Sequence, residues 1–258
     1  MILLLALQVA VTENVAYHDA DKRLNVLDLY LPEDGKGFPT LMWIHGGGWT
    51  TGDKDGYADL GRRFAEAGIG VAMIDYRLSP AVRHPDHVED CARAFAWLHA
   101  NIRKRGGDPA RLFVGGHSAG GHLAALLTLD GAYLDELKVP EGAIKAAIFM
   151  SAPYEIRPNR VYEAAFGKDA DVCRAASPIS YVENATMPIL VLTETVEDGK
   201  HKAIEQVKPF RKAVADRKNV RFIDAADRDH MGIVEEMARK GADPQRAAVI
   251  EFINEQKP

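Results

Sequence analysis

Short apolar runs recur along the chain, and segments with helix-like spacing separate them. The apolar runs fall at residues 40–44, 69–76, 111–116, 144–151, 189–193 and 220–224. The helix-like segments fall at residues 57–67, 88–105, 118–129, 200–217 and 244–254. Strands of a parallel sheet are buried on both faces and therefore read as continuous apolar runs. Their alternation with helices predicts an α/β fold in which helices cover both faces of a mostly parallel sheet.

The N-terminal region has a different pattern. Residues 8–18 and 24–31 read as two strands, and the second alternates apolar and polar positions before a turn-rich stretch at 32–37. Two strands so close in sequence predict an antiparallel opening to the sheet. Residues 1–10 are apolar, lack a preceding positive charge and are too short to span a bilayer. We interpret them as leading into the first strand of a cytoplasmic protein; a truncated export signal, implying secretion, is the alternative.

The sequence around Ser118 carries the clearest chemical signal. The apolar run at 112–115 meets residues 116–120, which read Gly-His-Ser-Ala-Gly, and an Ala- and Leu-rich helical segment begins at once. A Gly-x-Ser-x-Gly motif between a strand and a helix is typical of a nucleophile elbow. The glycines remove side chains that would collide with the flanking strand and helix. We expect Ser118 to be a catalytic nucleophile.

Other motifs place this elbow in a known context. Residues 45–49 read His-Gly-Gly-Gly-Trp after a predicted strand, residues 75–80 read Asp-Tyr-Arg-Leu-Ser-Pro, and residues 108–111 read Asp-Pro-Ala-Arg. Together with the elbow, these motifs resemble α/β-hydrolases of the esterase and lipase type, in particular hormone-sensitive-lipase-like and feruloyl-esterase-like carboxylesterases. The resemblance covers nearly the whole chain. It implies one α/β-hydrolase domain, residues 1–258, with an eight-stranded, mostly parallel sheet and a minimal cap.

The glycine triplet at 46–48 has a chemical interpretation in such an enzyme. Gly47 and Gly48 carry no side chain, so their backbone N–H groups can approach a substrate carbonyl unobstructed. The N–H of Ala119 is expected at a helix N-terminus, where negative charge is favoured. We therefore expect these three amides to form an oxyanion hole. Trp49 is a candidate substrate contact or a core aromatic residue, and the sequence favours neither.

The general base is expected after the nucleophile, because this fold orders its triad as serine, acid and histidine. Of the nine histidines, only His122, His201 and His230 follow Ser118. His122 is fixed to the elbow helix, and His201 stands at the start of a predicted helix. His230 follows the last predicted strand, where the resemblance places the catalytic histidine. His230 is therefore the candidate base.

The triad acid is expected after the strand at 189–193. In the related esterases it is commonly an aspartate four residues beyond the last residue of that strand. Without a gap this count selects Glu197, and a shift of the loop by one residue selects Asp198. Either carboxylate can orient the imidazole and stabilise its charged form. Glu197 is the preferred prediction, and Asp198 is the alternate acid.

Composition and charge narrow the set of partners. The 258 residues carry a net charge of -5 with both signs mixed throughout, which argues against a nucleic-acid interface and a polybasic membrane patch. No membrane span is expected. The two cysteines, Cys91 and Cys173, lack metal-ligand spacing. Residues 84–90 contain histidines and aspartates, but they precede a helix whose first turn favours acidic residues. We expect neither a metal nor another cofactor.

These residues predict a serine carboxylic-ester hydrolase that works through an acyl-enzyme. The connection at 152–187 is expected to be the only cover, which favours an open site for short acyl esters or for bulky aryl or sugar esters. An arylformamidase acting on N-formylkynurenine is the alternative, because residues 155–158 read Glu-Ile-Arg-Pro and also resemble kynurenine formamidases. A non-catalytic binding module on the same fold is a second alternative. Such modules often lose the serine or the histidine, and this chain keeps both.

Overall fold

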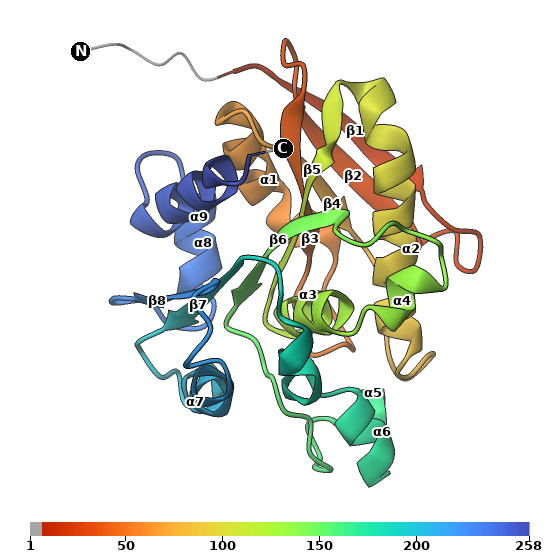
Figure 1. Cartoon of the computed structure of the whole chain (residues 1–258), viewed down its shortest axis with the longest axis vertical. Helices are drawn as coiled ribbons and strands as arrows, with labels where there is room; N and C mark the ends of the chain where they lie inside the picture. The colour runs from red at the N-terminus through yellow and green to blue at the C-terminus, as the bar shows by residue number, and fades with distance from the viewer. Residues whose placement is uncertain (1–6, 258) are drawn as a thin grey trace.

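A computed structural model describes residues 7–257 and contains a central eight-stranded sheet (Figure 1). The strands are β1 (Val9–Ala16), β2 (Val26–Pro32), β3 (Phe38–Ile44), β4 (Gly70–Ile74), β5 (Gly107–His117), β6 (Ile144–Met150), β7 (Ile189–Glu194) and β8 (Val220–Ala225). Their order across the sheet is β1-β2-β4-β3-β5-β6-β7-β8. β2 pairs antiparallel with β1 and β4, and the other neighbouring pairs are parallel. The predicted mostly parallel sheet with an antiparallel opening is confirmed.

Helices connect the parallel strands. The longer ones are α1 (Ala58–Glu66), α2 (Asp86–Asn101), α3 (Ala119–Leu129), α7 (Ala203–Ala213), α8 (Gly232–Ala238) and α9 (Pro244–Glu255). The shorter ones are α4 (Ala132–Asp135), α5 (Glu163–Phe166) and α6 (Ala170–Ala175), with the 3-10 helices η1 (Lys54–Tyr57), η2 (Ile102–Arg105) and η3 (Pro178–Asn184). Two features differ from the sequence pattern: α8 occupies a stretch that reads as loop, and β5 begins before its apolar run does.

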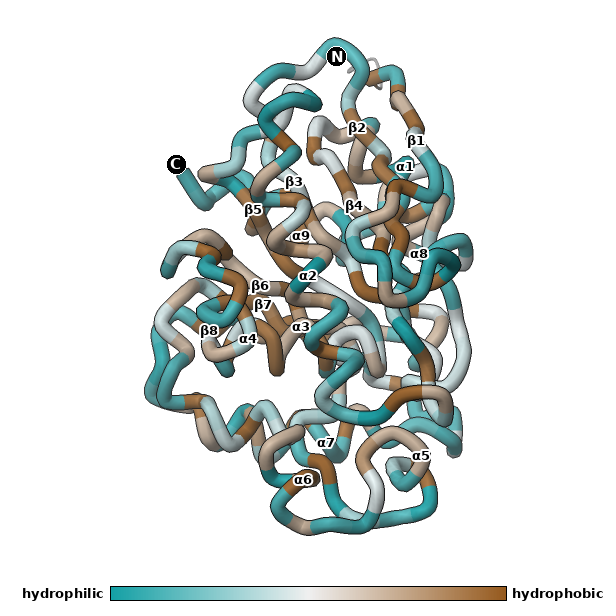
Figure 2. Tube along the Cα trace, turned by 90° about the vertical axis from the view of Figure 1, so that its right-hand side faces the viewer, coloured by the Kyte–Doolittle hydropathy of each residue, from teal (hydrophilic) through white to brown (hydrophobic). Residues whose placement is uncertain are grey.

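Alternation along the strands separates two hydrophobic cores. In β5, Leu112 and Val114 belong to one core, and Phe113 belongs to the other. The first core includes residues of α2, α3 and α7, and the second includes residues of α1, α8 and α9. Figure 1 shows α2 and α3 on one side of the sheet and α8 and α9 on the other. Figure 2 shows apolar, brown colouring along the central strands, as expected for strands buried on both faces.

The parallel strands run in one direction, so their carboxyl ends meet at one edge of the sheet. Loops that leave such ends form the binding sites of open α/β sheets. The loops after β3, β5, β6, β7 and β8 begin at His45, Ser118, Ser151, Thr195 and Ala226. This edge therefore collects the segments that carry the predicted site residues.

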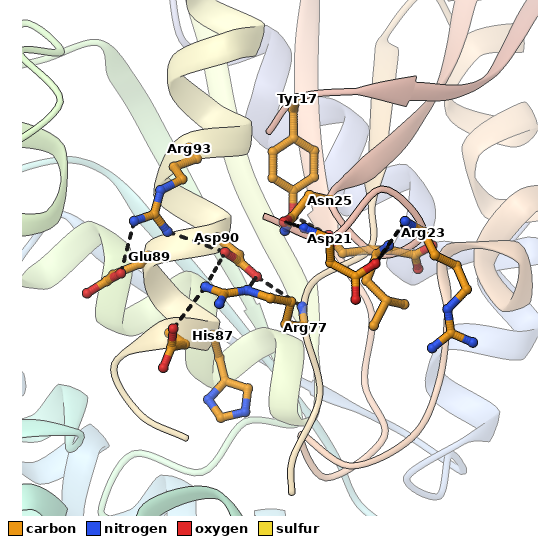
Figure 3. A network of polar contacts seen from close by, with 12 residues as sticks. Tyr17, Asp21, Arg23, Asn25, Arg77, His87, Glu89, Asp90 and Arg93 are labelled. Carbon is orange, nitrogen blue, oxygen red and sulfur yellow. Dashed lines mark hydrogen bonds and ion pairs between the residues drawn. The ribbon is translucent and has the colours of Figure 1, made fainter. Parts of the chain in front are cut away.

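An ion-pair network holds the segment after β4 against α2 (Figure 3). Arg77 donates to both carboxylate oxygens of Asp90 at 2.8 Å and lies 3.0 Å from Asp86. Arg93 pairs with Glu89 and Asp90. The side chain of Asp90 is fully buried, and a buried carboxylate must be paired to be tolerated. These acidic residues bind arginines, and among residues 7–257 no group of His, Cys, Asp and Glu side chains is arranged to hold a metal ion.

The N-terminal strand is exposed over much of its length. β1 begins at Val9. Residues 1–6, which belong to that segment, lie outside the described residues. Within the described range 7–257, no helix has the length and apolar character needed to cross a bilayer.

Candidate active site

Ser118 lies on a sharp turn between β5 and α3. Its backbone has φ 57° and ψ -122°, a sparsely populated conformation that costs about 1–3 kcal/mol. A Cβ at Gly116 would collide with the Gly120 carbonyl, and a Cβ at Gly120 would collide with the Ile44 carbonyl of β3. Glycine is required at both positions because the backbones of β3, β5 and α3 meet here. The predicted nucleophile elbow has this geometry.

The Ser118 side chain contacts His230. The Ser118 Oγ lies 2.9 Å from the His230 Nε2. His230 stands in the short loop between β8 and α8, and its side chain is 4% exposed. The Ser118 N–H donates to the Met150 carbonyl at 2.9 Å, which ties the turn to β6. The fold therefore brings the predicted nucleophile and the predicted base within hydrogen-bond distance.

Glu194, the last residue of β7, is the carboxylate that faces His230. Its Oε1 lies 3.0 Å from the His230 Nδ1, and its side chain is 3% exposed. Because an ionised carboxylate only accepts, Nδ1 carries the hydrogen and Nε2 is free to accept the Ser118 hydroxyl hydrogen. Burial raises the pKa of Glu194, but the His230 hydrogen bond and the nearby Ser151 hydroxyl outweigh burial and hold this pKa below its ordinary value. Glu194 is therefore ionised at neutral pH.

This geometry corrects the expectation that Glu197 or Asp198 contacts His230. Glu197 is exposed in the loop after β7. Asp198 binds His201 instead: its Oδ2 lies 2.6 Å from the His201 Nδ1, and its Oδ1 accepts from the amides of His201 and Lys200. These hydrogen bonds hold the pKa of Asp198 below its ordinary value. Counting four residues beyond the strand misses the contact between Glu194 and His230, because the count assumes that the acid lies in the loop. The carboxylate that reaches His230 comes from the strand itself.

Strand periodicity explains why Glu194 faces His230. Leu190 and Leu192 belong to the core that α8 covers, and Glu194 continues their alternation along β7. His230 stands just before α8, on the same side of the sheet. A glutamate is also one methylene longer than an aspartate, which lets it reach from the strand end. The sequence signal for Glu194 is an acidic residue at the end of an apolar, buried strand. A buried carboxylate requires a hydrogen-bonding or charged partner, so such a residue is a candidate to pair with the histidine.

His201 covers one face of His230. The two imidazole rings are stacked, with centroids 3.8 Å apart and an interplanar angle of 12°. The His201 side chain is 41% exposed. The hydrogen bonds to Asp198 hold His201 in place, so the Asp198–His201 pair shields the His230 imidazole from solvent without contacting its Nδ1.

The loop after β3 faces the elbow. Gly47 has φ 122°, a backbone conformation that favours glycine, and its carbonyl accepts from the Thr51 amide at 3.0 Å. The Gly47 and Gly48 amides donate to no backbone carbonyl within the described part of the chain. Ala119 is the first residue of α3, where amides have no helical partner. All three residues line one pocket with Ser118, as amides that bind an oxyanion must.

The pocket beside Ser118 has a volume of about 1740 Å³. Its walls come from the loop after β3, from the connection at 152–187, from the start of α7 and from α8. Val161 and Met231 border it with exposed fractions of 74% and 45%. The site is therefore open and wide, and short segments cover it in part.

Trp49 borders this pocket but is largely buried beneath the covering connection. It is 2% exposed. Its ring packs edge-to-face on those of His122, Tyr162 and Phe166, with centroids 5.1, 5.6 and 4.9 Å apart. His122 donates from Nε2 to the Ala176 carbonyl at 2.7 Å, and burial lowers its pKa to about 3. Both residues thus join the elbow helix to the cover, and Trp49 offers little surface to a substrate.

Sequence relatives of this chain carry esterase names. A profile of the BD-FAE family matches residues 27–200. Esterase LipC of Mycobacterium tuberculosis is 31% identical over 91% of this chain and 63% of its own length. A probable isoprenylcysteine alpha-carbonyl methylesterase of Oryza sativa, ICMEL1, is 44% identical over 47% of this chain. The chain covers 63% of LipC and 28% of the Oryza protein, so it spans less than two thirds of either relative.

Solved structures share the fold at low sequence identity. Esterase B from Lactobacillus rhamnosis superposes with a TM-score of 0.80 at 20% identity, covering 97% of this chain and 86% of that one. A truncated carbohydrate esterase from gut microbiota superposes with a TM-score of 0.81, also at 20% identity, covering 96% of both chains. These likenesses establish the α/β-hydrolase fold. Because the family profile matches more than half of its length, this chain belongs to the BD-FAE family.

Proposed function

We propose that the protein is a serine carboxylic-ester hydrolase acting on short-acyl or aryl esters. The observation that carries the proposal is the hydrogen-bonded chain from the Ser118 Oγ through His230 to Glu194, with distances of 2.9 and 3.0 Å. In serine hydrolases such a chain raises the nucleophilicity of the serine, because the histidine takes its proton as the oxygen attacks. The esterase names of the sequence relatives support the same activity.

Each residue has a role in this mechanism. Ser118 attacks the ester carbonyl, and His230 takes the proton and returns it to the leaving alcohol. Glu194 accepts from the His230 Nδ1 and stabilises the imidazolium. It thus takes the role that was expected of Glu197 or Asp198 from the sequence. The amides of Gly47, Gly48 and Ala119 stabilise the tetrahedral oxyanion, each contributing about 2.7–4 kcal/mol. Water then attacks the acyl-enzyme with His230 as base.

The width of the site supports the proposed substrate range. At about 1740 Å³ the pocket exceeds the roughly 300–1,000 Å³ typical of small-ligand sites. It therefore has room for a bulky alcohol or aryl group next to a short acyl group. Arg157, which belongs to the formamidase-like stretch, is exposed at the pocket rim and pairs with Glu155 at 2.8 Å.

A substrate series tests the proposal. The wild-type protein is assayed on p-nitrophenyl esters of increasing acyl length, on methyl ferulate and on N-formylkynurenine, with Ser118→Ala as the matched control. We expect turnover of short or aryl esters by the wild type, none by the variant, and stoichiometric fluorophosphonate labelling of the wild type alone. Preference for N-formylkynurenine over every ester would identify a formamidase instead. No turnover and no labelling would indicate a non-catalytic binding module.

A further inference from the structure

Two side chains outside the triad, the half-buried Tyr57 and the buried His117, connect the oxyanion loop to the catalytic histidine. The Gly46 amide lies 3.0 Å from the Tyr57 hydroxyl, and this hydroxyl lies 3.0 Å from the His117 Nδ1. The His117 Nε2 lies 2.8 Å from the backbone carbonyl of His230. This series of hydrogen bonds thus begins beside the glycines of the oxyanion loop and ends on the backbone of the proposed base.

The chemistry of these groups permits one direction for every hydrogen bond. The His230 carbonyl can only accept, so the His117 Nε2 carries a hydrogen and donates. Burial lowers the pKa of His117 to about 3, so the ring is neutral and its Nδ1 accepts from Tyr57. Burial also raises the pKa of Tyr57 to about 12, so its hydroxyl keeps the hydrogen that it donates. The Tyr57 oxygen in turn accepts from the Gly46 amide, and every member has a partner.

The hydrogen bonds join four segments that are distant in sequence. Gly46 follows β3, Tyr57 ends η1, His117 ends β5, and His230 lies between β8 and α8. Glu194 holds the His230 side chain, whereas His117 holds its backbone. The rings of His117 and His230 also lie in contact, with centroids 4.8 Å apart. The distance from Nε2 to the Ser118 Oγ depends on both restraints.

We infer that Tyr57 and His117 are positioning residues that fix the catalytic histidine relative to the oxyanion loop; this inference rests on the proposed function. The base and the oxyanion donors act on opposite sides of one reacting carbonyl, so a change in their separation misaligns the transition state. A misplacement of about 1 Å can lower turnover by about 10²-fold without loss of substrate binding. The residue before the nucleophile thus has a role that the elbow motif alone does not assign.

The decisive variant is Tyr57→Phe, which removes both hydrogen bonds and keeps the ring. Tyr17→Phe is its matched control, because the buried Tyr17 hydroxyl also donates once, to the Asp75 carbonyl at 2.7 Å, and accepts once, from Asn25 at 3.1 Å. Figure 3 shows Tyr17 and Asn25 beside the network of Arg77. We expect the two variants to lower Tm to a similar extent. Only Tyr57→Phe should lower kcat, by about 10- to 100-fold, with KM within about threefold of wild type.

Variants of His117 separate positioning from packing. In His117→Gln the side-chain amide still donates to the His230 carbonyl, whereas His117→Leu fills the space without donating. We expect His117→Gln to retain at least about ten times the kcat of His117→Leu, and fluorophosphonate labelling of Ser118 to slow in the same order.

Three results would overturn the inference. If Tyr57→Phe kept wild-type kcat while its Tm fell as in Tyr17→Phe, the hydrogen bonds of Tyr57 and His117 would stabilise the fold without positioning His230. The proposed function would stand. Equal kcat values for the Gln and Leu variants of His117 would lead to the same conclusion. If the wild type neither hydrolysed esters nor reacted with fluorophosphonate, both the proposed function and this inference would fall.

Discussion

Replacing Glu194 by glutamine tests the corrected assignment of the triad acid. The substitution keeps the volume of the side chain and its ability to accept from the His230 Nδ1, but it removes the negative charge. In the wild type the two groups are 3.0 Å apart and almost fully buried, so solvent screens their attraction weakly. The lost charge matters in the transition state, when His230 becomes an imidazolium.

The expected loss of kcat in Glu194→Gln follows from the distance between the two charges. With charge centres about 4 Å apart and an effective dielectric constant of about 20, the attraction is worth about 4 kcal/mol. Since each ~1.4 kcal/mol changes a rate tenfold, we expect kcat to fall by about 10³-fold. In another serine hydrolase, changing the triad acid to its amide lowers turnover by about 10⁴-fold, which is within about tenfold of this value.

The assay is p-nitrophenyl ester hydrolysis at pH 7.5, with Tm measured for every variant. Glu197→Gln is the matched control, because Glu197 is an exposed carboxylate in the adjoining loop. We expect the control to keep kcat within about twofold of wild type. A loss of about 10³-fold in the control, together with near-normal turnover in Glu194→Gln, would show that the loop supplies the acid and would refute the geometric assignment.

Three further predictions address other features of the site. Asp198→Asn should loosen the stacked His201 and lower kcat by less than about tenfold; a loss as large as that in Glu194→Gln would make Asp198 the acid. Gly120→Ala should lower Tm and abolish turnover, because the new Cβ would meet the Ile44 carbonyl, and a normal Tm would contradict the close approach. Burial lowers the pKa of His122 to about 3, so the unfolded chain binds more protons as pH falls below about 6.5. Unfolding free energy should therefore decline from pH 7 to 4, and less in His122→Gln; equal declines would refute this linkage.

The sheet and the elbow could be predicted from the sequence because both depend on local patterns. Apolar runs identify strands buried on both faces, and the spacing of Gly116, Ser118 and Gly120 identifies a turn in which a Cβ at either glycine would collide with backbone. The position of His230 followed from the order of the triad and from its place after the last strand. These features require no knowledge of which side chains meet across the sheet.

The acid and α8 could not be predicted in the same way. The identity of the acid depends on the face of β7 from which a side chain projects and on where the β8–α8 loop passes, and both are set by tertiary packing. Glu194 and Glu197 are the same residue type three positions apart, so composition cannot separate them. α8 begins at Gly232, a poor helix former, and the Asp229 side chain accepts from the Gly232 amide at 2.7 Å.

The packing of Trp49 has a consequence for redesign of the proposed esterase. Trp49 adjoins Gly48 in sequence and has φ 60°, while its ring is clamped by Tyr162 and Phe166 of the covering connection. Exchanging that connection for one from another protein would release the ring and disturb the glycine amides with it, so specificity and rate would change together. Val161 and Met231 border the pocket with exposed side chains. A combinatorial library limited to these two positions would reshape the pocket wall while leaving the clamp intact.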